Sequence, residues 1–303
     1  MLARNLIHIH PEVAAALAEH APAVALESTL ITHGFPHPQN LEIARKIEQT
    51  VRDNGAIPAT IAILHGKITV GLTAEQLETL ANDPHARKCS VRDLPLVLAQ
   101  KKNGATTVAA TMTIAHRAGI AVFATGGIGG VHRGSQFDVS ADLMELGKTP
   151  VTVVCAGMKA FLDLPDTLEY LETQAVPVLG YQTDELPAFY SRNSGLPVDA
   201  RVDSAADVAE VIAARDALDL SQAILVTVPV PTKAEWKADA AKAVIAQAQA
   251  EIETTGISGK NITPYMLAKI AELSGEESMR ANIALLLNNA RVGAEIARAL
   301  AAH

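Results

Sequence analysis

Lys159 ends an apolar segment, Val151–Lys159 (VTVVCAGMK), so its amine is expected beside small and apolar side chains instead of in bulk water. Desolvation disfavours the ammonium form, lowers the pKa of a lysine and supplies the neutral amine that forms a Schiff base. A lysine that follows a strand is more often simply solvated. This segment alone leaves both interpretations open.

Glu27 follows the apolar run Pro22–Leu26, at the point where the chain leaves an expected strand. A carboxyl placed there can have a raised pKa and act as a general acid or base, or it can support a turn. His33 and His37 lie nearby and suggest zinc. However, Pro36 and Pro38 prevent the continuous helix that an H-E-x-x-H site requires, so we exclude zinc there.

The segment Thr125–Gly134 (TGGIGGVHRG) contains five of the 19 glycines of the chain and comes directly after another apolar run. Glycines allow backbone N–H groups to turn toward an anion, and His132 and Arg133 can add donors. The segment fits neither the dinucleotide fingerprint nor the Walker loop. It therefore predicts a phosphate-binding loop through Thr125, Gly126, Gly127 and His132, with a tight surface turn as the alternative.

Asp138 and Asp142 stand four residues apart in DVSAD, a spacing that places both carboxylates on one face of a helix. Oxygen ligands suit a hard cation such as Mg²⁺ or Mn²⁺, which keeps several waters when few carboxylates hold it. Helix capping by Asp138 or Ser140 explains the same residues. The spacing alone leaves both interpretations open.

The elements that must position these residues alternate between short β-branched runs and amphipathic stretches of helical length. This pattern predicts an α/β fold with a largely parallel or mixed sheet. Helices are expected at residues 40–54 and about 278–302. The expected strands are 23–26, 60–64, 121–124, 151–155, 176–180 and 224–228.

The small and polar residues follow the carboxyl ends of these runs, and open α/β sheets bind ligands in the crevice at that edge. We therefore expect Glu27, the glycine-rich segment and Lys159 to face one pocket. No linker or repeat divides the chain, which predicts one domain over 1–303 with room for a small excursion about residues 184–220.

Composition narrows the classes of partner. The 303 residues are 49% hydrophobic and carry a net charge of −8, which disfavours a nucleic-acid surface and still allows a basic pocket for one phosphate. No run of 18 apolar residues occurs, so no membrane span is expected. Two widely separated cysteines and the absence of a secretory signal predict a cytoplasmic protein without a disulfide framework.

Several long motifs together resemble those of one known protein family. The chain closely resembles the pseudouridine-5′-phosphate glycosidase family from about residue 8 to its C-terminal helix. The motifs that carry the resemblance are 25–40 (ALESTLITHGFPHPQN), 57–64 (IPATIAIL), 103–109 (NGATTVA), 123–134 (FATGGIGGVHRG), 138–143 (DVSADL) and 153–159 (VVCAGMK).

The resemblance implies reversible cleavage of the C–C glycosidic bond of pseudouridine 5′-phosphate to uracil and ribose 5-phosphate. It makes Lys159 the Schiff-base nucleophile, Glu27 the proton donor and Asp138 the Mn²⁺ ligand. It also implies an α/β/α core and a homotrimer. The substrate contacts that it implies are Lys88, Val108, Ser140, Ala141, Asp142 and Asn282.

Two other functions fit the same residues. A lysine, a carboxylate and a phosphate loop would also serve a Schiff-base aldolase acting on another sugar phosphate. A non-catalytic sensor of phosphorylated metabolites could use the loop alone, although the presence of both Glu27 and Lys159 disfavours it. The chain departs from the family pattern in a shorter segment at 135–137, at Val91 and in the loop 228–232.

Overall fold

A computed structural model describes residues 6–134, 138–257, 259 and 262–303. Within these residues, eleven strands form one sheet with the order β1-β4-β3-β2-β7-β8-β11-β9-β10, and β6 and β5 branch from β3. The strands are β1 (Ile7–Ile9), β2 (Ala23–Leu26), β3 (Ile57–Leu64), β4 (Lys67–Val70), β5 (Arg87–Cys89), β6 (Gly104–Thr106), β7 (Val122–Ala124), β8 (Thr152–Cys155), β9 (Val178–Tyr181), β10 (Ala200–Val202) and β11 (Ile224–Thr227).

Strand direction explains where the polar residues gather. The strands from β3 through β2, β7, β8, β11, β9 and β10 all run parallel, whereas β4 and β6 pair antiparallel with β3. The central strands β2, β7, β8 and β11 are completely buried and mainly apolar, as expected for parallel strands covered on both faces. Their carboxyl ends therefore meet at one edge.

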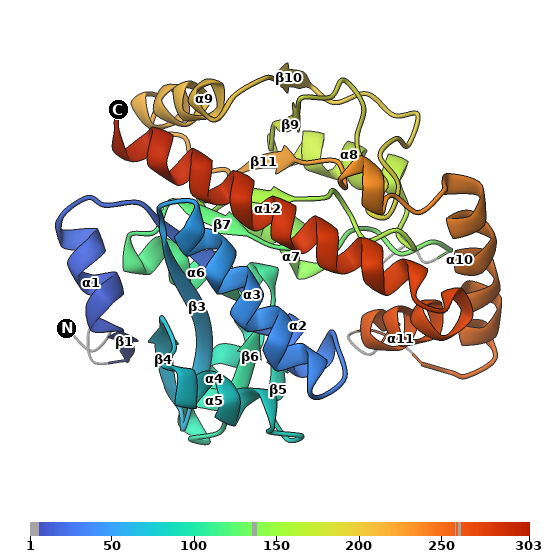
Figure 1. The fold of residues 1–303 in the computed structure, drawn as a ribbon, viewed down its shortest axis with the longest axis horizontal. Helices are drawn as coiled ribbons and strands as arrows, with labels where there is room; N and C mark the ends of the chain where they lie inside the picture. The colour runs from blue at the N-terminus through green and yellow to red at the C-terminus, as the bar shows by residue number, and fades with distance from the viewer. Residues whose placement is uncertain (1–5, 135–137, 258, 260–261) are drawn as a thin grey trace.

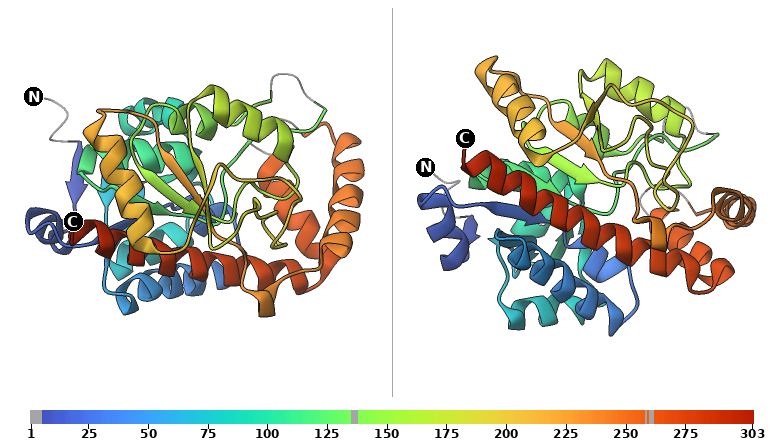
Figure 2. Two further views of the ribbon diagram at one scale, coloured as in Figure 1. Left: turned by 90° about the horizontal axis from the view of Figure 1, so that it is seen from above. Right: turned by 45° about the horizontal axis from the view of Figure 1, so that its top comes forward.

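Helices cover both faces of the sheet, which confirms the predicted α/β/α class. Figure 2 shows α12 and α3 on one side and α6 and α8 on the other. The helices are α1 (Pro11–Ala18), α2 (Thr29–His33), α3 (Gln39–Asp53), α4 (Ala74–Ala81), α5 (Leu94–Ala99), α6 (Val108–Ala118), α7 (Ala141–Leu146), α8 (Leu164–Thr173), α9 (Ala205–Ala217), α10 (Ala238–Glu253), α11 (Ile262–Ser274) and α12 (Glu277–Ala301).

The long helix α12 crosses the sheet (Figure 1) and packs closely against it. A Cβ atom at Gly293 would lie 3.1 Å from the Cβ of Ala124 on β7, so glycine permits this approach. Ala290, Ala294 and Ala297 are also buried on α12. Small residues thus let the helix backbone lie close to the strands that carry the polar residues.

The six strands expected from the sequence are all present, with ends that differ by up to three residues. The largest difference is at β3, which begins at Ile57 and so includes Pro58, although proline is uncommon within strands. The sequence analysis missed β1, β4, β5, β6 and β10, which are only three or four residues long and lack a continuous apolar run. Both predicted helices are confirmed as α3 and α12.

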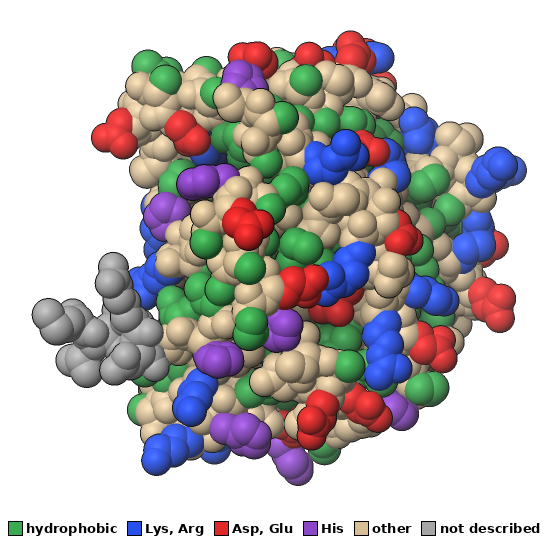
Figure 3. Space-filling model, turned by 60° about the vertical axis from the view of Figure 1, so that its left-hand side comes forward, with side chains coloured by type: hydrophobic (Ala, Val, Ile, Leu, Met, Phe, Trp, Pro, Cys, Tyr) green, Lys and Arg blue, Asp and Glu red, His purple; other side chains and the backbone are tan. Residues whose placement is uncertain are grey.

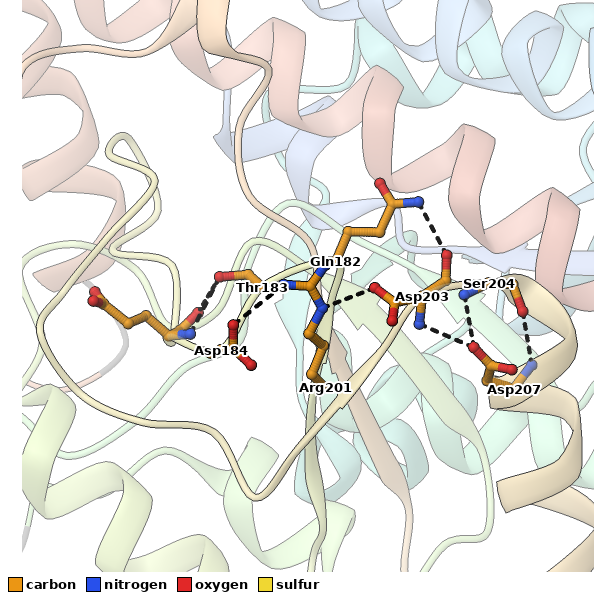
Figure 4. A network of polar contacts seen from close by, with 8 residues as sticks. Gln182, Thr183, Asp184, Arg201, Asp203, Ser204 and Asp207 are labelled. Atoms are coloured by element: carbon orange, nitrogen blue, oxygen red, sulfur yellow. Dashed lines mark hydrogen bonds and ion pairs between the residues drawn. The ribbon is translucent and has the colours of Figure 1, made fainter.

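Residues 184–220, where the sequence left room for an excursion, contain most of the loop after β9 together with β10 and α9. Figure 4 shows how this loop is attached: Arg201 on β10 forms ion pairs with Asp184 and Asp203. Asp207 accepts hydrogen bonds from the backbone N–H groups of Asp203 and Ser204 at the start of α9. These contacts connect the loop to the edge strand.

The surface carries both signs of charge. On the face shown in Figure 3, basic and acidic side chains are interspersed with apolar ones. Among the described residues, no helix is long and apolar enough to cross a bilayer. Both cysteines, Cys89 and Cys155, are buried.

Candidate active site

A cavity of about 530 Å³ opens at the carboxyl ends of β2, β7 and β8, and we call it the reaction cavity. It is bordered by Glu27 after β2, Thr125 after β7 and Lys159 after β8. The predicted convergence of these three segments is therefore confirmed. Apart from Arg133, the site residues named from the sequence line this cavity: Glu27, Lys88, Val108, Thr125, Gly126, Gly127, His132, Asp138, Ser140, Ala141, Asp142, Lys159 and Asn282.

The pairing of β7 with β8 continues beyond both strands and brings Lys159 to the glycine-rich segment. The N–H of Thr125 donates to the carbonyl of Val154 at 2.9 Å, and the N–H of Lys159 donates to the carbonyl of Ile128 at 3.2 Å. The side chain then turns back, and Lys159 Nζ donates to the carbonyl oxygen of Gly127 at 2.8 Å. The amine is thus held at the cavity wall by a neutral acceptor.

Glu27 is the proton-donor candidate, and its surroundings favour the protonated form. Burial raises the pKa of its carboxyl, while nearby Lys159, the Thr125 hydrogen bond and Lys88 act in the opposite direction without cancelling the effect. Thr125 Oγ1 donates to Glu27 Oε1 at 2.5 Å. Glu27 therefore combines a raised pKa with a fixed orientation.

His132 lies beside Asp138, and the N–H of His132 donates to the Asp138 carbonyl at 2.9 Å. Burial lowers the pKa of the imidazole, with Lys159 and Lys88 acting in the same direction and Asp138 opposing them. A lowered pKa favours a neutral imidazole at pH 7, which can donate one hydrogen bond and accept another. His132 can therefore act in the cavity as a neutral polar group.

The glycines of the 125–134 segment serve close packing. A Cβ atom would lie 2.6 Å from the Phe189 ring at Gly127, 2.2 Å from Ser140 Oγ at Gly129 and 2.5 Å from Thr167 Oγ1 at Gly130. None of these three has a positive φ. Glycine is needed at these positions because neighbouring side chains occupy the space of a Cβ.

Five of the ten backbone N–H groups of this segment donate to protein oxygens, which limits its predicted role as an anion cradle. These are the N–H groups of Thr125, Ile128, Gly129, Val131 and His132. Among the described residues, the N–H groups of Gly126, Gly127 and Gly130 make no hydrogen bond to a protein acceptor. Arg133, a further expected donor, is directed to the carbonyl of Leu162 instead.

Asp142 links the glycine-rich segment to α6. Its Oδ1 accepts from the N–H of Ala109 at 3.0 Å, and its Oδ2 accepts from the N–H of Gly129 at 2.9 Å. The expectation that Asp138 and Asp142 share a helix face is wrong, because α7 begins only at Ala141. The alternative, helix capping, is confirmed for Ser140. Its hydroxyl accepts a hydrogen bond from the N–H of Asp142 and caps α7.

This geometry leaves Asp138 as the carboxylate to consider for a metal. Both oxygens of Asp142 are already hydrogen-bonded, and no group of three His, Cys, Asp or Glu side chains suited to a metal occurs among the described residues. One carboxylate fits a hard cation that keeps most of its waters. The shortened segment 135–137 lies outside the described residues.

One end of the reaction cavity is basic and carries two hydroxyl groups that the sequence analysis missed. Lys88 and Arg92 line this end. Ser90 Oγ and Thr107 Oγ1 are buried there, with no hydrogen-bond partner in the described part of the chain. Thr107 is the N-cap residue of α6, yet its hydroxyl does not cap the helix. Two unused hydroxyls, a lysine and a helix N-terminus together suit an anion.

Apolar side chains from several elements also line the cavity, together with Asn282 of α12. The sequence analysis named only Asn282, because these residues come from segments far apart in the chain. The apolar residues are Leu30, Phe35, Phe189, Leu267 and Leu286. These apolar side chains suit a planar ring more than a charged group.

Asn289 is a second residue that the sequence analysis missed. It is 1% exposed on α12, and its Nδ2 donates to the carbonyls of Thr125 at 2.8 Å and Gly126 at 3.3 Å. It lies seven residues after Asn282, so both amides lie on one face of α12. A buried asparagine on an apolar helix face could have indicated that its amide holds a neighbouring backbone segment in place.

Comparisons with known proteins agree with this geometry. A family model described as Indigoidine synthase A like protein matches residues 12–299. A protein of Paracoccus denitrificans named pseudouridine-5′-phosphate glycosidase is 55% identical over 300 residues, covering 98% of this chain and 99% of its own length. A protein of the same name from Caldanaerobacter subterraneus is 54% identical, covering 97% of this chain and 96% of its own length.

Two crystal structures are also similar to the chain. The prealnumycin C-glycosynthase AlnA, in complex with ribulose 5-phosphate, is 43% identical with a TM-score of 0.90, covering 98% of this chain and 97% of its own. An indigoidine synthase A-like protein from Thermotoga maritima is 35% identical with a TM-score of 0.90 and the same coverage. The similarity therefore includes the whole arrangement of strands around the cavity.

Proposed function

Since this chain belongs to the pseudouridine-5′-phosphate glycosidase family, we propose that it cleaves pseudouridine 5′-phosphate to uracil and ribose 5-phosphate through a Schiff base on Lys159. The observation that carries the proposal is the placement of a lysine amine and a carboxyl with a raised pKa on the wall of one cavity. These are the nucleophile and the acid that the reaction requires.

The bond to be broken sets the chemical problem. Carbon 5 of uracil is the leaving atom, and its direct departure would leave a poorly stabilised carbanion. Proton donation by Glu27 to the ribose ring oxygen opens the sugar, and conjugation through the uracil ring makes C1′ electrophilic. The raised pKa of Glu27 favours the protonated carboxyl that this step requires.

Lys159 then forms a bond from Nζ to C1′, for which it must be in the neutral amine form. Once carbon 5 of uracil accepts a proton, the nitrogen lone pair forms the C1′=N bond as the C1′–C5 bond breaks and neutral uracil leaves. Water adds to the iminium carbon, the C1′–N bond breaks, and open-chain ribose 5-phosphate is released. The hydrogen bond of Nζ to the Gly127 carbonyl supports this assignment by holding the amine at the cavity wall.

We place the 5′-phosphate at the basic end of the cavity. Lys88 supplies positive charge there, and Ser90 and Thr107 supply hydroxyl groups without other hydrogen-bond partners in the described chain. The amino-terminal end of α6 adds its positive dipole. Phosphate bound at this end would orient C1′ toward Lys159, so remote binding energy contributes to alignment.

Asp138 is our candidate ligand for Mn²⁺, with waters completing the coordination. A bound Mn²⁺ would supply positive charge that orders water and polar groups of the substrate. Asp142 has a different role in the proposal, because its two hydrogen bonds hold Gly129 and Ala109 in place. The family resemblance also leads us to propose a cytoplasmic homotrimer, whose subunit number light scattering would test.

Incubation of the protein with pseudouridine 5′-phosphate, with and without Mn²⁺, tests the activity. Chromatography with ultraviolet detection should show uracil appearing in step with ribose 5-phosphate. Borohydride added with ribose 5-phosphate should leave a reduced mass adduct on Lys159. An adduct on Lys88 instead would contradict the assignment of the nucleophile, and stabilisation by the nucleotide without release of uracil would indicate a sensor.

A further inference from the structure

The loop after β9 makes a tight turn at residues 188–191 (AFYS), and we call it the aromatic turn. The N–H of Ala188 donates to the carbonyl of Ser191 at 3.0 Å, so Phe189 and Tyr190 are the two central residues of a hairpin loop. Phe189 has a φ of 62°. Glycine is the usual residue where the first central position of such a loop has a positive φ, and an aromatic residue there strains the backbone.

The segment after β11 holds the aromatic turn in place. The N–H of Trp236 donates to the carbonyl of Tyr190 at 3.0 Å, and Ser191 Oγ donates to the carbonyl of Trp236 at 2.8 Å. The Tyr190 ring lies edge-on to the rings of Phe189 and Trp236, with centroid distances of 4.8 Å and 5.5 Å. These contacts keep the strained conformation, because the turn cannot relax without breaking them.

The ring of Phe189 packs against the backbone that holds the proposed nucleophile. Phe189 is 3% exposed and borders the reaction cavity. Two of its ring atoms lie so close to Gly127 that a Cβ atom there would be 2.6 Å and 2.8 Å away. The carbonyl oxygen of Gly127 is the acceptor for Lys159 Nζ at 2.8 Å. The ring therefore covers the peptide that orients the amine.

A second part of the same loop packs against the extension of β8. A Cβ atom at Gly157 would lie 2.7 Å from the carbonyl oxygen of Pro187, which comes just before the aromatic turn. The carbonyl of Gly157 accepts from the N–H of Ile128 at 3.1 Å, within the paired segments that lead to Lys159. Pro187 and Phe189 thus confine both of these paired segments from one side.

We propose that Phe189 is a positioning residue for the Lys159 amine, because its ring confines the Gly127 peptide whose carbonyl directs Nζ toward C1′. The inference rests on the proposed Schiff-base mechanism. Glycine has the widest range of backbone conformations, so an uncovered Gly127 could rotate its carbonyl and take the amine with it. A nucleophile displaced by about 1 Å reacts much more slowly, even when the substrate binds normally.

The backbone of Phe189 supports this role. Strained residues of this kind concentrate at active sites, where the surrounding structure holds them. Glycine at position 189 would form the turn without strain but would leave the Gly127 peptide uncovered. The strained conformation therefore has one effect that glycine could not supply, which is to place an aromatic ring at the cavity wall.

Replacing Phe189 with glycine and with alanine separates the ring from the backbone. Both variants lack the ring, so both should lower kcat for pseudouridine 5′-phosphate by about tenfold or more, with KM changed by less than about threefold. Their stabilities should differ, because glycine relieves the positive φ and alanine does not, so Phe189→Gly should unfold at the higher temperature. A kcat that follows the unfolding temperature, or stays at the wild-type value, would overturn the proposal.

Borohydride trapping measures the amine directly. At saturating ribose 5-phosphate, Lys159 should be labelled about tenfold more slowly in Phe189→Ala than in the wild type. Phe189→Leu fills part of the space of the ring and should recover part of the labelling rate and of kcat. Labelling of Lys159 at the wild-type rate in Phe189→Ala would show that the ring does not position the amine, and the proposal would be wrong.

Ile212→Ala is the matched control for lost packing. Ile212 is fully buried on α9 and does not border the reaction cavity, so the variant should unfold at a lower temperature with near-normal kcat and labelling. The wild type itself tests the proposed function, which fails if the protein neither cleaves the nucleotide nor is labelled on Lys159. If the wild type does both and Phe189→Ala equals it, only the positioning role fails.

Discussion

The Nδ2 of Asn289 donates to the backbone carbonyl of Thr125 at 2.8 Å, and Thr125 in turn donates its hydroxyl to the carboxylate of Glu27. A helix near the end of the chain thereby fixes the residue that orients the proposed proton donor. The three residues belong to α12 and to the segments after β7 and β2. Asn289 is a positioning residue, since it does not line the reaction cavity.

Replacing Asn289 with leucine should lower kcat. The substitution leaves the carbonyls of Thr125 and Gly126 without their buried donor, at a cost of about 1–3 kcal/mol, and a comparable rise in the barrier lowers kcat about tenfold or more. Steady-state kinetics should show a larger change in kcat than in KM.

Asn288→Leu is the matched control, because Asn288 is the neighbouring amide and its contacts are with Pro229 and Arg291 instead of the glycine-rich segment. The control should keep near-normal kcat. Thermal unfolding of both variants separates a general loss of stability from a displaced Glu27. Equal kinetic losses in the two variants would contradict the positioning role.

Thr125→Val should shift the pH dependence of cleavage. The hydrogen bond from Thr125 lowers the pKa of Glu27 and therefore opposes the increase caused by burial. Its removal raises the pKa further. Since Glu27 acts as an acid in its protonated form, activity falls as the pH rises through this pKa, and the alkaline limb of kcat/KM should move to higher pH in the variant. A limb that moves to lower pH would argue against Glu27 as the donor.

Ser90→Ala and Thr107→Val should weaken binding of the phosphate. Each substitution removes one proposed hydrogen bond to a charged group, so we expect KM for pseudouridine 5′-phosphate to rise about tenfold. Unphosphorylated pseudouridine serves as the control substrate, and its kcat/KM should change little. A parallel loss with both substrates would place the phosphate elsewhere, and the glycine-rich segment would then be the next position to test.

Asp138→Asn should weaken the response to Mn²⁺. An amide oxygen carries no net charge and is a poorer ligand for a hard cation than a carboxylate. After treatment with a chelator, the variant should need a higher Mn²⁺ concentration than the wild type for half-maximal activity. Glu145→Gln is a useful comparison, because Glu145 also borders the cavity but accepts hydrogen bonds from Thr113 and Thr149. Identical Mn²⁺ curves for Asp138→Asn and the wild type would exclude Asp138 as the ligand.

The sequence by itself determined the fold class, the six central strands and the meeting of Glu27, Thr125 and Lys159 at one edge. These features follow from local properties of the chain: β-branched runs form buried strands, and residues that follow parallel strands meet at one edge. The family resemblance added Lys88, Val108, Asp138 and the other cavity residues, whose spacing alone carries little information.

Only the tertiary structure decided the features that depend on contacts between distant segments. The hydroxyls of Ser90 and Thr107 are ordinary in sequence, and they matter because folding buries both at the basic end of the cavity without a partner among the described residues. Asp142 became a structural link because Ala109 and Gly129 approach its two oxygens from separate elements. Burial and hydrogen-bond pairing are properties of three-dimensional neighbours, and the order of residues along the chain does not specify them.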